Sequence, residues 1–213
     1  HWMGTLSFPD AFVTGLSMKP DIHERLRKVH GIDAACPITL HTLSTDAFGI
    51  KGLTRYTTTF IAFEPDPFFA MMNLQWIEGD PATAQRRLNE GGCVLVAREF
   101  LVTKGLGVGK TIMLKDPATG NTHTFEIVGV VASPGLEVAS KFFEVGENYV
   151  DQAVSSVFGH RKDLINYFND DAVNMVQLSF TPGADPDATM SSIMKIPGSG
   201  ILTSGTAVWL KQR

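Results

Sequence analysis

The sequence predicts an α+β protein in which two β-α-β units form one lobe and a small α/β subdomain is inserted between them. A β-α-β pattern of apolar residues is present near both ends of the chain. Between the two lies a run of strand, helix and hairpin signals from Leu74 to Ser133. With 213 residues and 44% apolar content, the chain can bury about 70% of its unfolded surface and form a core without metal or disulfide.

The first β-α-β unit opens with a strand from Phe12 to Met18, in which alternate residues point to opposite faces. The following helix is predicted from one apolar stripe, formed by Ile22, Leu26 and Val29. Gly31 suits the left-handed residue that ends such a helix. A second strand follows, with Ile38 and Leu40 on one face.

The last unit repeats this order. The strand from Val176 to Phe180 alternates, and Asp185 is placed to cap a helix whose first residue is Pro186. The apolar stripe of that helix is formed by Met190, Ile193 and Met194. A short strand from Leu202 to Trp209 completes the unit. If both units share one sheet, the start of the first strand and the end of the last strand lie at the same edge.

The insert is predicted as a small α/β subdomain with a β-hairpin. The strand Cys93–Ala97 is continuously apolar, which indicates burial on both faces. A short helix follows, and the run GLGVGKT ends it through Gly105 and Gly109 and starts the hairpin. The second hairpin strand runs from Thr122 to Val131, after a turn with Gly120 in the left-handed position.

The segment 135–171 is predicted to hold two helices that link the insert back to the first lobe. The first stripe is formed by Val150, Ala153, Val154, Val157 and Phe158, and Gly159 ends that helix. The second stripe is formed by Leu164, Ile165 and Phe168.

Charge and hydropathy exclude two classes of protein. The 18 basic and 22 acidic side chains give a net charge of -4 and form no basic cluster, so no nucleic-acid partner is expected. No apolar run reaches the roughly 18 to 20 residues that cross a bilayer. His1–Met3 resemble a cloning remnant and are left out of the fold prediction.

The GLGVGKT run also has to be weighed as a nucleotide site at Lys110 and Thr111. A phosphate loop needs glycine where Lys104 stands, and it leads from a strand into a helix, whereas this run leads from a helix into a strand. We therefore interpret it as a structural turn and keep nucleotide handling as a minor alternative.

No catalytic, cofactor or metal site is predicted. His23 and His30 share a helix face but are about 10 Å apart by helix rise, too far to bind one ion. Ser133 and Ser204 lie outside any G-x-S-x-G motif. The acidic pairs, Glu64 with Asp66 and Asp170 with Asp171, fall in expected loops, where solvent explains them. The chain is therefore not expected to be an enzyme.

One apolar segment is a candidate contact for a partner or lipid. It contains Phe68, Phe69, Met71, Met72, Leu74 and Trp76. Methionine-rich aromatic surfaces adapt to apolar ligands. The alternative, which the composition favours, is that these side chains form core.

The two cysteines leave two alternatives open. Cys36 and Cys93 could form one disulfide in an oxidising compartment. Their positions in predicted strands favour two separate buried thiols instead.

The ordered set of an EGD start, GLGVGKTI and FEIVGVV resembles the extracytoplasmic domain of FtsX-like and MacB-like ABC permeases, and the runs SSVFGHRKDLINYF and VQLSFTPGADPDATMSSI extend the resemblance. It implies a ferredoxin-like, porter-like lobe at 10–62 and 141–210, and a Sabre-like subdomain at 63–140. Gly79 and Gly129, with the turn glycines above, would be scaffold positions.

The resemblance also implies a function. The domain would sit outside the cytoplasmic membrane, between two membrane helices, and would couple ATP hydrolysis by a separate cytoplasmic ATPase subunit to handling of a substrate or accessory protein. Expected partners are that ATPase, a second permease subunit and an accessory adaptor or lipoprotein. The rival interpretation is a stand-alone extracytoplasmic module that binds lipid or peptide.

Overall fold

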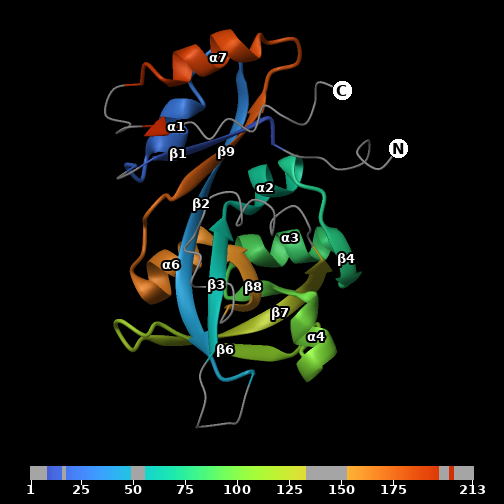
Figure 1. Ribbon diagram of the computed structural model, residues 1–213. Helices are drawn as coiled ribbons and strands as arrows, with labels where there is room; N and C mark the ends of the chain where they lie inside the picture. Colours follow the sequence, from blue (N-terminus) through green and yellow to red (C-terminus); the bar gives the residue numbers. More distant parts are fainter. Residues whose placement is uncertain (1–8, 16–17, 49–55, 133–152, 197–201, 204–213) are drawn as a thin grey trace. The chain divides into compact units, whose positions relative to one another are not determined.

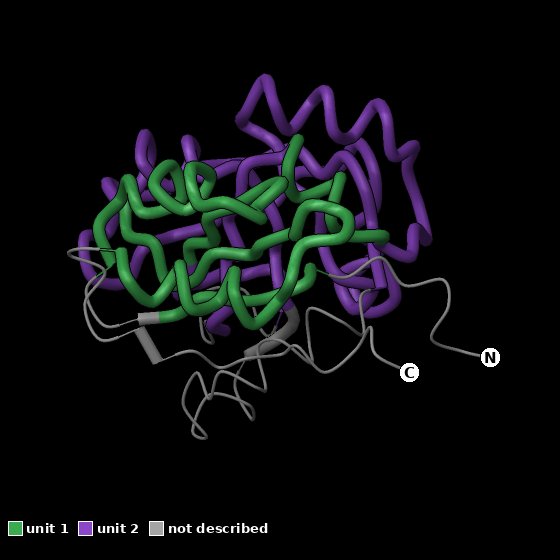
Figure 2. The backbone as a smooth tube through the Cα atoms, turned by 90° about the horizontal axis from the view of Figure 1, so that it is seen from above, with its two compact units in different colours: residues 1–39, 66–73, 171–213 green, residues 40–65, 74–170 purple. Residues whose placement is uncertain are grey.

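The computed structural model describes residues 9–15, 18–48, 56–132, 153–196 and 202–203 (Figure 1). The chain is α+β, as the sequence predicts. Contacts divide it into two units (Figure 2). Unit 1 comprises 1–39, 66–73 and 171–213, and unit 2 comprises 40–65 and 74–170.

Unit 1 is built on an antiparallel sheet in the order β10-β1-β9-β2. Its strands are β1 (Ala11–Gly15), the first half of β2 (Ile32–Thr45), β9 (Met175–Phe180) and β10 (Leu202–Thr203). Its helices are α1 (Ile22–Leu26), most of α2 (Pro65–Met71) and α7 (Pro186–Ile193). Its core includes Ala11, Val13, Ile22, Leu26, Ala35, Val176, Leu178 and Ile193.

The predicted start of α7 is confirmed, but α1 ends at Leu26 with Arg27 as its C-cap, before the predicted exit at Gly31. The Asp185 carboxylate accepts the Asp187 N–H at 3.0 Å, and Pro186 is the first residue of α7. Gly31 has φ +92°, and a side chain there would collide with Thr189. Glycine is therefore required at this position.

The first and last strands of the described chain are neighbours. Thr14 is opposite Thr203 and Gly15 is opposite Leu202, in antiparallel register. β10 therefore runs back toward the start of β1, which confirms the predicted shared edge for these residues. The rest of the predicted last strand, up to Trp209, lies outside the described residues.

Unit 2 contains the remaining strands and helices. The strands are the second half of β2, β3 (Tyr56–Phe63), β4 (Gln75–Glu78), β5 (Cys93–Ala97), β6 (Thr111–Lys115), β7 (Thr122–Ala132) and β8 (Ala153–His160). The helices are α3 (Pro81–Glu90), α4 (Arg98–Lys104) and α6 (Arg161–Phe168). The strand order is β2-β3-β8-β5-β7-β4.

Strand β6 closes this sheet into a ring. It forms the predicted hairpin with β7, and Ser44 and Thr45 of β2 pair with Lys115 and Leu114 at its other edge. The path β2-β3-β8-β5-β7-β6 thus returns to β2. Closure removes free edges from these strands, because each has partners on both sides.

The unit 2 core follows the two-residue period of these strands. Its strand residues are Leu43, Phe60, Ala62, Val94, Val96, Ile112, Leu114, Phe125, Ile127, Val130 and Val157, and the helices add Phe100, Leu164 and Phe168. Alternate positions such as 112 and 114 share one face of a strand. Gly159 leaves room for Phe60, since a side chain there would collide with that ring.

Several predictions need correction. The segment Ala153–His160 is strand β8, not a helix; it pairs with β3 in parallel and with β5 antiparallel. Pairing with β3 and β5 sets the extended conformation of this segment, so the helix-like spacing of its apolar residues is misleading. The sequence analysis also missed β3, α2 and α3, although Asp80 caps α3 by accepting the Thr83 N–H at 2.8 Å.

The grouping by contacts also differs from the predicted domain ranges, which placed 10–62 and 141–210 in the porter-like lobe and 63–140 in the inserted subdomain. Residues 40–62 and 141–170 group with unit 2. The physical reason is that β2 and β3 are hydrogen-bonded into the ring that contains the insert strands. The ranges stay a prediction about subdomains.

The β1–β10 pair can be tested by cross-linking. Replacing Thr14 and Thr203 with cysteine should give a disulfide under air, detected by mass and by thiol titration, because opposed antiparallel residues are about 4.5–5.5 Å apart at Cα. In the control pair, Ala11→Cys with Thr203→Cys, the two positions are about 10 Å apart along the strand and should stay reduced. Equal oxidation of both pairs would contradict the register.

Candidate functional site

The predicted apolar contact segment is mostly core. Phe68 on α2 is 0% exposed, and Met71, Met72 and Leu74 are also buried. Phe69 and Trp76 are half-buried. The Phe68 and Phe69 rings meet edge to face, with centroids 5.7 Å apart. Phe68, Phe69, Met71 and Met72 belong to unit 1, and Trp76 belongs to unit 2. A role for these five residues in partner or lipid contact stays a prediction.

The run 105–110 is a turn whose amides are already used. Gly105, with φ +64°, ends α4. The N–H groups of Gly107, Val108, Gly109 and Lys110 donate to Gly105 O, Glu78 Oε2, Ile127 O and Gly107 O. A phosphate cradle needs such amides free to point at the ligand. This geometry argues against nucleotide binding at Lys110 and Thr111.

The other predicted turn glycines have two kinds of environment. Gly79, Gly109 and Gly120 have φ of +99°, +82° and +80°. Gly129 lies on β7, where a side chain would collide with the ring of Trp76 and with Leu95. Gly129 therefore permits Trp76 to pack on the strand backbone.

A polar cluster that the sequence analysis missed lies in unit 2. His41 Nδ1 donates to Asp170 Oδ2 at 2.6 Å, and His41 Nε2 faces Asp116 Oδ2 at 3.8 Å. The exposed fraction of the side chain is 19% for His41, 20% for Asp170 and 5% for Asp116. The expectation that solvent explains Asp170 is therefore wrong, because residues distant in sequence meet here.

Charge and hydrogen bonding shift the titration of this cluster. The hydrogen bond to Asp170 raises the pKa of His41 against the opposing effect of burial, and the charges of Asp170 and Asp116 add to it. Burial acts to raise the pKa of Asp116. Hydrogen bonds from the Ala118 amide and the Thr119 hydroxyl, with the charge of His41, outweigh burial and lower that pKa.

A second buried carboxylate links α6 to the start of β5. Asp163 is 2% exposed and accepts the Gly92 N–H at 3.1 Å. Burial raises its pKa to about 6. Nearby, burial raises the pKa of the Cys93 thiol to about 12, so its thiolate is disfavoured. Cys36 and Cys93 are both buried thiols and do not form a disulfide with each other, so the two-thiol alternative holds.

The other polar residues considered from sequence do not form a reactive group. In the described part of the chain, no three His, Cys, Asp or Glu residues are arranged to hold a metal ion. His23 is buried. Asp170 pairs with His41. Ser133 and Ser204 lie outside the described residues.

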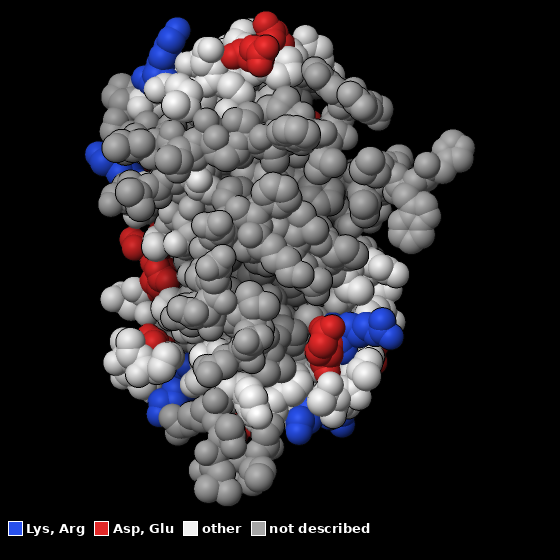
Figure 3. Space-filling view, in the orientation of Figure 1, with Lys and Arg blue, Asp and Glu red and all other residues white. Residues whose placement is uncertain are grey.

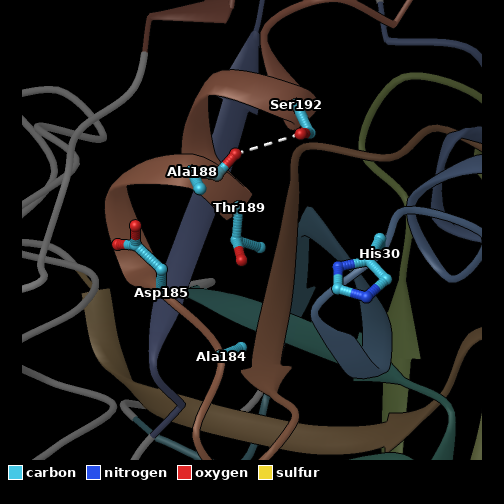
Figure 4. Close-up of a pocket in the computed structure, with 6 residues that line it drawn as sticks. All are labelled: His30, Ala184, Asp185, Ala188, Thr189 and Ser192. Carbon is cyan, nitrogen blue, oxygen red and sulfur yellow. Dashed lines mark hydrogen bonds between the residues drawn. The ribbon is translucent and has the colours of Figure 1, made fainter.

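A shallow depression in unit 1 lies beside α7 (Figure 4). It is lined by His30, Ala184, Asp185, Ala188, Thr189 and Ser192, and its volume is about 130 Å³. Ser192 Oγ donates to Ala188 O, and Asp185 caps its own helix. Ligand pockets usually hold about 300–1,000 Å³. This depression is too small for such a ligand.

The described side chains on the face in Figure 3 carry both signs of charge in several separate places. No extended patch of one sign is visible among them, so this part of the surface lacks the basic stripe of a nucleic-acid site. Among the described residues, no helix is long and apolar enough to span a membrane.

The sequence matches the family model of the MacB-like periplasmic core domain over residues 4–196. The chain belongs to this family. It is an extracytoplasmic domain of a MacB-like ABC transporter. A search of curated protein sequences gave no significant match.

Two solved structures show the same fold as this MacB-like domain. The periplasmic region of MacB from Actinobacillus actinomycetemcomitans has a TM-score of 0.59 at 12% identity, over 86% of this chain and 79% of that chain. The extracellular domain of the noncanonic ABC-type transporter YknZ from Gram-positive bacteria has a TM-score of 0.56 at 13% identity, over 85% of this chain and 87% of that chain.

The burial of the apolar segment in this MacB-like domain predicts unequal effects of two neighbouring substitutions. Phe68→Ala should lower the free energy of unfolding by about 3–5 kcal/mol, because it leaves a cavity in a fully buried site. Phe69→Ala should cost clearly less, since Phe69 is half-exposed. Urea unfolding of both variants measures the difference, and equal losses would refute the assignment of Phe68 to the core.

Asp163 predicts a pH dependence of stability. Its pKa is raised from 3.8 to about 6 in the folded chain, so folding disfavours its charged form. The contribution of Asp163 to the free energy of unfolding is largest below pH 4 and is lost as the pH rises through about 6. The loss is at most about 3 kcal/mol. Asp163→Asn keeps an acceptor for the Gly92 N–H and should not show this loss.

The measurement is the unfolding free energy of the wild type and of Asp163→Asn at pH 4 and pH 7. The unfolding free energy of Asp163→Asn should increase relative to that of the wild type as the pH rises. The exposed Asp187→Asn is the matched control and should follow the wild type. If Asp163→Asn also follows the wild type, the buried carboxylate does not control this pH dependence.

Proposed function

We propose that this domain transmits motion between the membrane part of a MacB-like ABC permease and a substrate or accessory protein outside the membrane. ATP hydrolysis by a separate cytoplasmic ATPase subunit drives the motion. Two membrane helices carry it to the domain, and no bond chemistry takes place in the domain itself. A second permease subunit completes the transporter, and an adaptor or lipoprotein is the expected accessory partner.

The observation that carries the proposal is the pairing of β1 with β10. The chain enters unit 1 through β1 and leaves it through β10, so both ends of the described chain lie on the two neighbouring strands at one side of the sheet. Two membrane helices attached there would act on one hydrogen-bonded element. A displacement of the helices would therefore move the sheet instead of unravelling it.

The absence of a reactive arrangement in the described residues agrees with this role. The Cys93 thiolate is disfavoured, and the amides of the 107–110 turn are occupied. The histidine of the unit 2 cluster contacts carboxylates, not a hydroxyl or thiol nucleophile. These features favour a mechanical role over an enzymatic one.

The test uses the intact permease with its ATPase in nanodiscs. Spin labels at Val102→Cys, a position 69% exposed on α4, report the distance between two permease copies by pulsed electron paramagnetic resonance. Trapping the ATP-bound state should shift this distance by several Å, on the scale of the domain movements that accompany closure.

A double label at Val102→Cys and Met113→Cys within one chain is the control. Both positions belong to unit 2, so their distance should not change with nucleotide. An unchanged distance between copies in the presence of ATP and vanadate, with normal ATP hydrolysis, would overturn the proposed coupling. A nucleotide response of the intrachain pair would show deformation of unit 2 instead of movement of the domain.

A further inference from the structure

His41 joins three segments of unit 2 that are far apart in sequence. His41 lies on β2, Asp170 follows α6, and Asp116 begins the turn between β6 and β7. Asp116 also orders that turn, because it accepts hydrogen bonds from the Ala118 N–H and the Thr119 hydroxyl at 2.8 Å each. The cluster therefore connects β2 with a helix end and with a hairpin turn.

The cluster also lies where the chain passes between units. His41 is the second residue of unit 2 along β2, and Asp170 is the last residue of that unit. On the unit 1 side, the Asn174 N–H donates to Ile38 O at 2.9 Å, and the Thr39 hydroxyl donates to Ala172 O. The same two segments, β2 and residues 170–174, are therefore bonded to each other within each unit.

The protonation state of His41 decides whether the cluster attracts or repels. In neutral His41, Nδ1–H donates to Asp170, so Nε2 carries an unprotonated lone pair that faces the Asp116 carboxylate. Nε2 is buried and has no hydrogen-bond partner. In charged His41, Nε2 carries a proton and the ring cation lies between two carboxylates. Charging therefore replaces a repulsive contact with an attractive one.

The surroundings of the ring favour this response. Asp170 and Asp116 are the charged groups that face it, and Phe168 of α6 stacks on it with centroids 6.0 Å apart. His123 on β7 stacks on Tyr167 at 3.5 Å instead, and burial lowers the pKa of His123. The two histidines should therefore titrate at different pH.

We propose that His41, Asp116 and Asp170 form a pH-operated clasp: His41 stays bonded to Asp170, holds the β6–β7 turn to β2 through Asp116 when the imidazole is charged, and releases that turn when the imidazole is neutral. The proposal rests on the geometry of unit 2 and not on the transport role. The raised pKa of His41 sets the direction: the clasp is closed below about pH 6.5 and opens as the pH rises through the raised value.

The first test is an NMR titration of the histidine rings in the whole chain. His41 should titrate above His123 in the wild type. Asp170→Asn should lower the pKa of His41 more than Asp116→Asn does, because Asp170 is bonded at 2.6 Å and Asp116 lies at 3.8 Å. A His41 pKa at or below that of His123, or no response to Asp170→Asn, would overturn the proposal.

The second test is amide hydrogen exchange at pH 6 and pH 8.5, corrected for intrinsic rates. The Asp170 amide, which donates to Leu164 O, should keep its protection at both pH values, because neutral His41 still donates Nδ1–H to Asp170. The Gly120 amide, which donates to Asp116 O in the β6–β7 turn, should lose several-fold protection at the higher pH in the wild type. The Ala84 amide, on α3, should not. His41→Gln should remove the pH response, and His123→Gln should keep it. A response that persists in His41→Gln, or equal loss at Ala84, contradicts a local clasp.

Discussion

Backbone hydrogen bonding along β2 is the constraint on which most of this structure depends. Residues 32–38 of the strand pair with β9 in unit 1, and Ser44 and Thr45 pair with β6 in unit 2. A slip of one residue would turn the apolar positions of the strand to the wrong face. The second pairing also closes the unit 2 ring, so the inward positions of β6, Ile112 and Leu114, depend on it.

The elements predicted well are those whose signals are local. Asp185 before Pro186 marks the start of α7, and Gly105 marks the end of α4, each through its own backbone chemistry. Strand β8 was predicted wrongly because its conformation comes from β3 and β5, which flank it. The start of α3 at Asp80–Pro81 carried a local signal that sequence analysis could have used.

The polar cluster could not be predicted in the same way. His41 and Asp170 are 129 residues apart in sequence, and neither position has a motif that indicates the other. Their meeting depends on ring closure and on the position of α6. The family was readable because it depends on the order of many weak signals along the chain, whereas a contact depends on geometry that this order does not contain.

The two buried thiols have a consequence for how this domain reaches its native state. Each is fully enclosed, and they belong to different units. Outside the cytoplasm, oxidising enzymes act on any exposed pair of cysteines. A newly exported chain exposes both sulfurs until its units form, and a bond between them would trap it. Packing of each unit encloses its own sulfur and thereby protects it from this bond.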